Sequence, residues 1–382
     1  MIYFDNSATT KPYPEVIESF MKVSSDYFGN PSSLHGLGVQ AEKLLSAARK
    51  QIADLLKVKG SEIYFTSGGT EGNNLAIKGA AQYRNNRGKH IITTAIEHPS
   101  VEDACQSLTK SGFEITILPV NEYGQIDMTD LKEALREDTI LVSIMHVNNE
   151  VGSIQPIADI GKILERYPHV LFHVDNVQGA GKVPLSLREA NIDLCTFSGH
   201  KIHGLKGTGF LYIREGVQID PLFHGGNQET QIRSGTENVA GIVALSKAFR
   251  ISMNNQLLYH DKLEQIKTYL YKGLLETEGV LVNSPEEGAP HILNFSVPLL
   301  KSEVLLHALE SDGIIVSTTS ACSSKKRSVS KTVDAMFRDQ ARSESVIRIS
   351  TAYGNELEEA KRVLAAIRKI VANLEKIMRV AK

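Results

Sequence analysis

Residues 170–201 read VLFHVDNVQGAGKVPLSLREANIDLCTFSGHK. The stretch contains two short apolar runs, Val170–Val174 and Leu194–Phe197, and each run ends in polar residues. Short, almost continuously apolar runs are typical of parallel strands that are covered on both faces. Ligands of such sheets bind beyond the carboxyl ends of the strands. The pattern therefore predicts that Asp175, after the first run, and Lys201, after the second, face the same crevice.

Similar runs recur along the first two thirds of the chain and predict a layered α/β domain over about residues 15–255. Amphipathic helical stretches separate them, for example Val39–Leu56 and Ile157–Tyr167. The other five predicted strands are Ile63–Thr66, Ile91–Thr94, Ile115–Leu118, Ile140–Ile144 and Gly209–Ile213.

The pattern changes after about residue 255, and we expect a smaller α+β domain formed by residues 1–14 and 256–382. Its predicted strands are His291–Val297 and Val346–Ser350, and its predicted helices are Asp261–Glu276, Glu303–Ser311 and Glu356–Arg379. The Ser/Thr/Lys-rich segment Ser317–Lys331 has few apolar residues and is expected to be a mobile loop.

Composition excludes several functional classes. The 382 residues carry 42 Lys+Arg and 44 Asp+Glu, a formal net charge of −2, which provides no global attraction for nucleic acid. No apolar run is long enough for a membrane span, and no secretory signal is recognised at Met1–Asp5. The three cysteines are widely spaced and include no CxxC pair. This usage indicates a reducing, cytoplasmic setting and no cysteine-based metal site.

Lys201, in Ser198-Gly199-His200-Lys201, is a candidate nucleophile. An amine next to an apolar strand can be partly desolvated, which makes it more reactive. A surface lysine in a loop is the simpler interpretation of this residue taken alone. The S-x-x-K pattern of serine hydrolases also fits these letters, but its Lys-Thr-Gly and Ser-Asp-Asn partners do not occur in the chain.

Asp175 makes the interpretation of Lys201 more specific. A lone carboxylate at a strand end could simply cap the next helix. A carboxylate opposite a lysine is, however, the arrangement that pyridoxal 5′-phosphate (PLP) requires. The lysine binds PLP covalently, and the carboxylate keeps the pyridine nitrogen protonated so that the ring accepts electrons.

A glycine-rich turn, Thr66-Ser67-Gly68-Gly69-Thr70-Glu71, supplies candidate phosphate donors. It lies between a predicted strand and a predicted helix, where backbone N–H groups bind anions. Side-chain donors could come from the hydroxyls of Thr70 and Ser198 and from the imidazole of His200. Thr236 could add a further hydroxyl. His98, after another strand, could stack on a planar cofactor, although an ordinary loop histidine is the default interpretation.

Cys322, in Ser320-Ala321-Cys322-Ser323-Ser324, is the candidate reactive thiol. Lys325, Lys326 and Arg327 follow it, and nearby cations favour the thiolate. The same basic triplet could instead be a solvated loop or a docking patch. Cys195, inside an apolar run, is expected to be inert.

Together these motifs resemble the NifS/IscS-type cysteine desulfurases, which are fold-type-I, aspartate-aminotransferase-like PLP enzymes. The resemblance rests on Ser-Gly-His-Lys at 198–201, His-Val-Asp-x-x-Gln at 173–178 and Ser-Ala-Cys-Ser at 320–323. It runs nearly end to end, because further matching blocks occur at 3–10, 28–33, 146–152, 233–236 and 347–350. It implies a large domain with a mixed, mostly parallel seven-stranded sheet and a smaller α+β domain.

The resemblance also implies roles for individual residues. Lys201 would bind PLP covalently, Asp175 would pair with its pyridine nitrogen, His98 would stack on the ring, and Cys322 would carry a persulfide. The other implied cofactor contacts are Gln178 on the phenolic oxygen, Gly69, Thr70, Ser198 and His200 on the phosphate, Thr236 on the phosphate of a second subunit, and Asn149. Asn149 and Arg348 would hold the substrate carboxylate, and no metal is expected.

The implied activity is removal of sulfur from L-cysteine, giving L-alanine and a persulfide for a sulfur-acceptor protein. A homodimer is implied, with no membrane or direct nucleic-acid partner. The acceptor stays open among an iron–sulfur scaffold, a tRNA-thiolating enzyme and a thiamine-pathway carrier. Two alternatives remain: a PLP lyase or aminotransferase acting on another amino acid, and a non-catalytic sulfur-trafficking or RNA-docking module.

Overall fold

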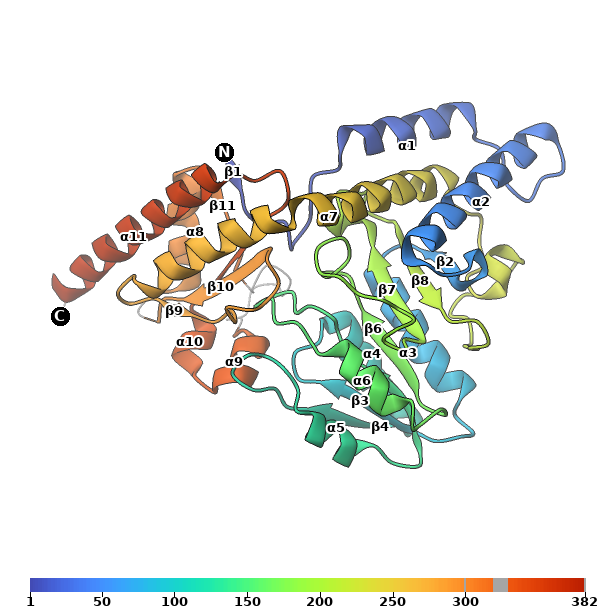
Figure 1. Ribbon diagram of the computed structural model, residues 1–382, viewed down its shortest axis with the longest axis horizontal. Helices are drawn as coiled ribbons and strands as arrows, with labels where there is room; N and C mark the ends of the chain where they lie inside the picture. Colours follow the sequence, from blue (N-terminus) through green and yellow to red (C-terminus); the bar gives the residue numbers. More distant parts are fainter. Residues whose placement is uncertain (299, 319–328, 381–382) are drawn as a thin grey trace.

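The computed structural model describes residues 1–298, 300–318 and 329–380, and its centre is a seven-stranded sheet (Figure 1). The strand order is β2-β8-β7-β6-β5-β3-β4. β8 runs antiparallel to both of its neighbours, whereas the remaining neighbours pair in parallel. The strands are β2 (Ile63–Thr66), β3 (His90–Thr94), β4 (Glu114–Leu118), β5 (Thr139–Ser143), β6 (Leu171–Asp175), β7 (Leu194–Ser198) and β8 (Gly209–Ile213). The predicted mixed, mostly parallel sheet is confirmed.

Both faces of this sheet are covered, which explains why its strands are apolar throughout. Successive strand residues point to opposite faces, so neighbours enter different hydrophobic cores. Leu171 packs with α3 (Gly69–Tyr83) and α4 (Pro99–Leu108) in one core. Phe172 enters the other core, to which α2 (Gly36–Leu56), α6 (Ile157–Leu164) and α7 (Val239–Leu275) contribute.

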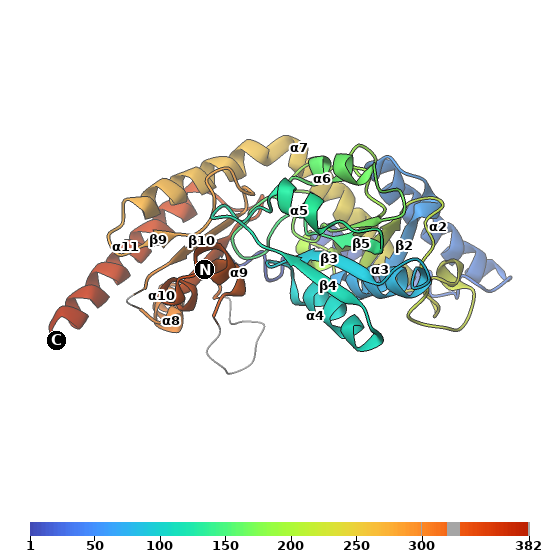
Figure 2. The same ribbon diagram turned by 90° about the horizontal axis from the view of Figure 1, so that it is seen from below.

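A second, smaller sheet lies beside the first (Figure 2). It has the antiparallel order β12-β10-β9, and a separate parallel pair joins β1 to β11. These strands are β1 (Ile2–Tyr3), β9 (Leu281–Val282), β10 (Ile292–Ser296), β11 (Ile314–Ile315) and β12 (Val346–Ser350). Their apolar residues pack with α8 (Ser302–Ser311), α11 (Leu357–Val380) and the second half of α7. The two strands predicted for this region are confirmed.

The helix α7 (Val239–Leu275) connects the two parts of the molecule, and 37 residues make it the longest described helix (Figure 1). Its first half packs on the large sheet and its second half on the small one. The sequence predicted only the second half, starting at Asp261, so the helix begins earlier than expected. A non-helical residue, Tyr259 (φ −129°), separates the halves. The proposed domain division at residues 255–256 falls inside this helix.

The remaining described elements are short or peripheral. The helices are α1 (Pro14–Asp26), α5 (Met128–Ala134), α9 (Lys331–Phe337) and α10 (Gln340–Glu344). The 3₁₀ turns are η1 (Gly60–Glu62), η2 (Thr109–Ser111), η3 (Gly199–Lys201) and η4 (Gln228–Gln231). Within the described part of the chain, every helix is too short or too polar to cross a membrane.

Candidate active site

The carboxyl ends of β6 and β7 bring Asp175 and Lys201 to one edge of the sheet, as predicted. The two strands are parallel neighbours in which Asp175 pairs with Thr196. β7 leads directly into the turn η3, which ends at Lys201. The Lys201 amine donates to the backbone oxygen of Ala8 at 2.8 Å and to that of Ser7. The N-terminal segment therefore holds the lysine over the sheet edge.

Asp175 is buried, and both of its carboxylate oxygens accept hydrogen bonds. The Asn73 amide donates to one oxygen at 2.7 Å, and the Val177 backbone N–H donates to the other at 2.9 Å. Asn73 also donates to the Ser100 hydroxyl at 2.9 Å. The carboxylate is thus fixed in position before any ligand arrives, which suits pairing with a ring nitrogen. Sequence reasoning missed Asn73, because an asparagine inside a helix carries no distinctive signal.

His98 belongs to the same electrostatic environment. It caps α4, and its Nδ1 lies 2.8 Å from the Ser100 hydroxyl. Burial lowers the pKa of His98, while Asp175 and Lys201 act on it in opposite directions. A neutral imidazole suits stacking on a cofactor ring, because it brings no extra charge into the buried site.

The N-terminus of α3 forms the expected anion cradle. A cavity of about 470 Å³ is lined by Gly68, Gly69 and Thr70 from this turn, together with Ser198, His200 and Lys206. Gly68 has a φ of +150°, and a Cβ on Gly69 would come within 2.9 Å of a Val177 methyl group. Burial and the charge of Lys201 lower the pKa of His200 to about 4. N–H groups, hydroxyls and a lysine are the donor set that a phosphate needs.

Gln178 carries a buried atom that lacks a partner. Its Nε2 donates to the backbone oxygen of Ser7 at 3.1 Å, so it shares that acceptor with Lys201. Its Oε1 is buried and has no hydrogen-bond partner among the described residues. A buried polar group without a partner is destabilising unless a ligand or water satisfies it. The glycine cradle, this orphan atom and the Asp175/Lys201 pair together fit PLP.

Thr236 lies apart from this group within a single chain. It lines a neighbouring cavity of about 240 Å³, which shares Ser67 and Gly207 with the cradle. Its loop is held by an ion pair between Arg233 and Glu71 at 2.9 Å. The contact of Thr236 with the phosphate bound by a second subunit therefore stays a prediction.

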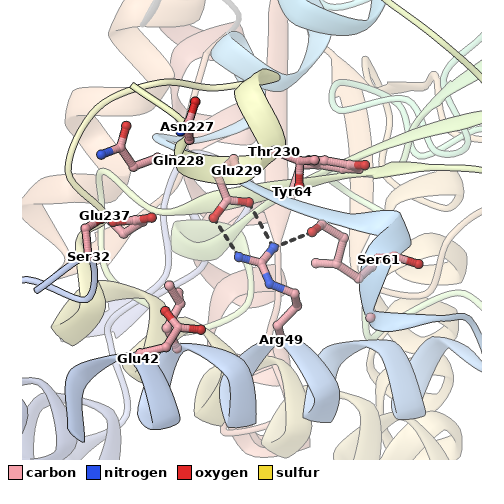
Figure 3. A pocket seen from close by; sticks show the side chains of 13 residues that line it. Ser32, Glu42, Arg49, Ser61, Tyr64, Asn227, Gln228, Glu229, Thr230 and Glu237 are labelled. Carbon is pink, nitrogen blue, oxygen red and sulfur yellow. Dashed lines mark hydrogen bonds and ion pairs between the residues drawn. The ribbon is translucent and has the colours of Figure 1, made fainter. Parts of the chain in front are cut away.

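The same loop is anchored at its other end by Glu229 (Figure 3). The Glu229 carboxylate accepts two hydrogen bonds from Arg49, at 2.9 and 2.7 Å, and a third from the Phe65 backbone N–H at 2.9 Å. Bidentate pairs of this kind are strong and directional. Arg49 lines a cavity of about 470 Å³. Because its guanidinium is paired with Glu229, we interpret this cavity as structural and not as a ligand site.

Arg348 and Asn149, which the sequence predicts to bind the substrate carboxylate, lie together. Arg348, on β12, is buried; its guanidinium donates to the Asn149 backbone oxygen at 2.9 Å and pairs with Asp5 at 3.0 Å. Its Nε is buried and has no partner among the described residues. The structure therefore places the guanidinium where a planar carboxylate can be recognised. The Asn149 contact uses its backbone, so its predicted side-chain role stays a prediction.

Cys322, the predicted nucleophile, lies outside the described residues, as do Lys325, Lys326 and Arg327. The described residues on either side of this segment lie close to Arg348 or to Glu150, which follows its contact Asn149. Ser317 forms a two-hydrogen-bond bridge with the backbone of Arg348, and the Ser330 hydroxyl donates to Glu150 at 2.5 Å. Burial raises the pKa of both described thiols, Cys105 (to about 12) and Cys195, so neither favours the thiolate.

Two further features escaped the sequence analysis. The backbone oxygens of Ser7 and Ala8 hold Lys201, and backbone atoms have no sequence signature. Lys182 is buried and donates to the backbone oxygen of Lys201 at 2.9 Å. Among the residues with described positions, no cluster of three or more His, Cys, Asp or Glu side chains is placed to hold a metal.

Comparison with known proteins identifies the family. The aminotransferase class-V model matches residues 2–363. The chain is 48% identical over 380 residues to a NifS/IcsS protein homolog of Lactobacillus delbrueckii subsp. bulgaricus, covering 99% of each protein. It is 42% identical over 374 residues to the cysteine desulfurase IscS of Methanosarcina thermophila, covering 98% of this chain and 92% of the relative.

A solved structure agrees with this placement. A NIFS-like protein superposes with a TM-score of 0.91 and 39% sequence identity, over 97% of this chain and 99% of the other. The mixed, mostly parallel sheet is that of the fold-type-I PLP enzymes, as the resemblance implied. The chain therefore belongs to the class-V aminotransferase family of PLP-dependent enzymes.

Proposed function

We propose that this protein is a PLP-dependent cysteine desulfurase. It would remove sulfur from L-cysteine and pass it, through a persulfide on Cys322, to an acceptor protein. The observation that supports this most is that Asp175 and Lys201 follow the neighbouring strands β6 and β7, with His98 in the same electrostatic environment. Relatives that cover nearly the whole chain and carry the name cysteine desulfurase support the reaction type.

The residues of the cofactor side would bind and orient PLP. Bound PLP supplies an electron sink that stabilises negative charge at the substrate Cα. Lys201 would hold the cofactor covalently and Asp175 would keep its ring nitrogen protonated. Thr70, Ser198 and His200, with the N–H groups of α3, would hold the phosphate. Gln178 would contact the phenolic oxygen, and His98 would cover the ring.

The residues of the substrate side would select and position L-cysteine. Arg348 would bind the carboxylate through the guanidinium edge that carries the unpartnered Nε, together with Asn149. The neutral Lys201 amine would accept the proton from the substrate Cα.

Cys322 would complete the reaction as a thiolate. Its sulfur forms an S–S bond with the substrate sulfur, while the Cβ–S bond breaks and its electron pair stays on the carbon skeleton. Two proton additions, at Cβ and at Cα, then give L-alanine. The balance is L-cysteine plus enzyme thiol giving L-alanine plus enzyme persulfide, with no external oxidant or reductant.

We further propose a homodimer in which Thr236 reaches the partner's phosphate. Large apolar side chains are exposed along α1 and the segment after it: Met21 is 64%, Phe28 72% and Leu34 98% exposed. Such a group of exposed apolar residues is typical of an interaction surface. We also propose a cytoplasmic location and an acceptor drawn from iron–sulfur assembly, tRNA thiolation or thiamine synthesis.

Intact-mass measurement tests the reaction and its nucleophile together. The holoenzyme is mixed with L-cysteine, without reductant, and its mass is measured. We expect at least one added sulfur on the wild type and on Cys105→Ala, none on Cys322→Ser, and one alanine for each sulfur removed. Formation of a keto acid in place of alanine would indicate an aminotransferase. Absence of any PLP absorption band would indicate a non-catalytic module.

A further inference from the structure

The turn that carries Lys201 is held through three successive backbone carbonyls, each of which accepts a hydrogen bond from a side chain. Thr10 donates to the oxygen of His200 through both its N–H and its hydroxyl, each at 2.9 Å. Ser252 donates to the oxygen of Ile202 at 2.9 Å. Between them, the amine of Lys182 donates to the oxygen of Lys201, also at 2.9 Å. The last carbonyls of a helical turn have no partner within the turn, so these three donors fix its conformation.

A lysine such as Lys182 is unusual as the donor to a buried backbone carbonyl. The residue is only 3% exposed, and no carboxylate pairs with it in the described part of the chain. A buried ammonium without a counter-ion is costly, and a hydroxyl such as that of Ser252 would satisfy the carbonyl at less cost. A charge-bearing group at this position therefore points to a role beyond the hydrogen bond.

The groups around Lys182 are mostly cationic or basic. Burial first, and the charge of Lys201 second, lower the pKa of Lys182 to about 7. The charge of Lys182 in turn lowers the pKa values of three buried or half-buried histidines. The titratable groups that interact with one or both lysines are His200 and His203 from the η3 region, His291 before β10 and His98, which caps α4. Asp175 on β6 acts on His98, and the Tyr353 hydroxyl donates to the Gly181 carbonyl next to Lys182.

We propose that Lys182 is a positioning residue for Lys201, which it holds through the backbone carbonyl, and that its positive charge makes the Lys201 nitrogen less basic in the covalent link to PLP. The inference rests on the proposed function, since it takes Lys201 as the lysine that binds PLP. A neighbouring cation disfavours a second positive charge in the same desolvated region. The active-site nitrogen would therefore lose its proton at a lower pH than it would without Lys182.

The test is a pH titration of the PLP absorption band, which changes when the linked nitrogen loses its proton. It uses the holoenzyme without substrate. In Lys182→Met we expect the midpoint to rise by about one pH unit. In Lys182→Arg, which is charged over the whole titration, we expect a midpoint no higher than that of the wild type. Lys267→Met is the matched control, because Lys267 is also buried and also donates to a backbone carbonyl, that of Glu286 at 2.9 Å. Its midpoint is expected to stay at the wild-type value.

The outcomes separate the inference from the proposed function. If the wild type shows a PLP band but Lys182→Met titrates at the wild-type midpoint, the electrostatic role of Lys182 is wrong and the function stands. If the wild type shows no band, or Lys201→Ala retains the covalent link, the proposed function itself fails. A purely structural role would lower the thermal midpoint of Lys182→Met without moving the titration. If Lys182→Met does not fold, Lys182→Gln takes its place with the same expected shift.

Discussion

The proposed cofactor side and the proposed substrate side of the site are built differently. On the cofactor side, the ends of parallel strands and the start of α3 present Asp175 and the phosphate cradle, and hydrogen bonds within the chain fix both Asp175 oxygens. On the substrate side, Arg348 comes from the small sheet and is held by Asp5 and the Asn149 backbone. Its Nε is left without a partner among the described residues.

This difference separates a preformed half from a half that a ligand would complete. On the cofactor side the Asp175 carboxylate is already held in position, which lowers the entropic cost of binding. The substrate side combines residues that are far apart in sequence, namely Asp5, Asn149 and Arg348. Substitutions on the cofactor side should therefore act on PLP, whereas those on the substrate side should act on L-cysteine and leave PLP in place.

The largest effect is expected for Lys201→Ala, which removes the centre of the cofactor side. Loss of the covalent link and of the base should reduce sulfur release by roughly 10³-fold or more. The visible PLP band and the rate of alanine formation measure the two losses. Lys162→Ala is the control, since Lys162 is an exposed lysine on α6 that pairs only with Asp159. Alanine formation within tenfold of wild type would contradict the assignment of Lys201.

A smaller effect is expected for Arg348→Lys, on the substrate side. Lysine keeps the charge but loses the planar, two-pronged geometry, so we expect KM for L-cysteine to rise about 30-fold. The affinity for PLP should not change. Arg342→Lys serves as the control, because Arg342 binds Asn283 and the Val282 carbonyl in the same small sheet. A rise in KM shared by both variants would point to a general loss of structure.

Gly69→Ala should act on the cofactor side alone, and more weakly. The added Cβ would come within 2.9 Å of a Val177 methyl group, so the cradle must shift by a few tenths of an ångström. We expect the dissociation constant of PLP to rise about tenfold, which corresponds to about 1.4 kcal/mol. Gly60→Ala is the matched control, since a Cβ there meets nothing within 4 Å. Equal PLP affinity in both variants would show that the cradle is not tightly fitted.

The smallest effect concerns the acid stability of the preformed half. The backbone N–H of His146 donates to the backbone carbonyl oxygen of Asp175 at 2.9 Å, and burial lowers the pKa of the His146 imidazole to about 4. The unfolded chain binds this proton near pH 6.5, so stability falls as the pH drops from 6.5 toward 4. His146 should account for about 1 kcal/mol of the loss between pH 7 and 5.5. His146→Leu should therefore show a correspondingly weaker pH dependence in urea unfolding, and an unchanged dependence would refute this.

Sequence reasoning predicted the residues of the cofactor side better than the groups that hold those residues in place. Asp175 and Lys201 could be placed because the carboxyl ends of parallel strands lie at one edge of a sheet. Asn73 and the Ser7 carbonyl could not be found, since their roles depend on which distant groups the fold brings near them. Lys182 was also missed, because a lysine in a turn usually lies at the surface.

The first half of α7 was missed for a different reason. Its residues are apolar on most sides, and Ala244, Leu245, Ala248 and Phe249 are all buried. A helix that is apolar on most of its surface lacks the one-sided periodicity that marks amphipathic helices in a sequence. The last helix was predicted from about residue 356 because its apolar residues follow that periodicity, and α11 is found at Leu357–Val380.

The N-terminal segment also constrains when the protein can become active during synthesis. Ile2 pairs with Ile314, the backbone N–H of Ser7 donates to the hydroxyl of Ser350, and the backbone oxygen of Ser7 accepts from the Lys201 amine. Residues 2–8 are synthesised before β11 and β12, the strands that hold them. A nascent chain therefore cannot fix the Lys201 amine in place until Val346–Ser350 has left the ribosome, so the site cannot be complete before that point.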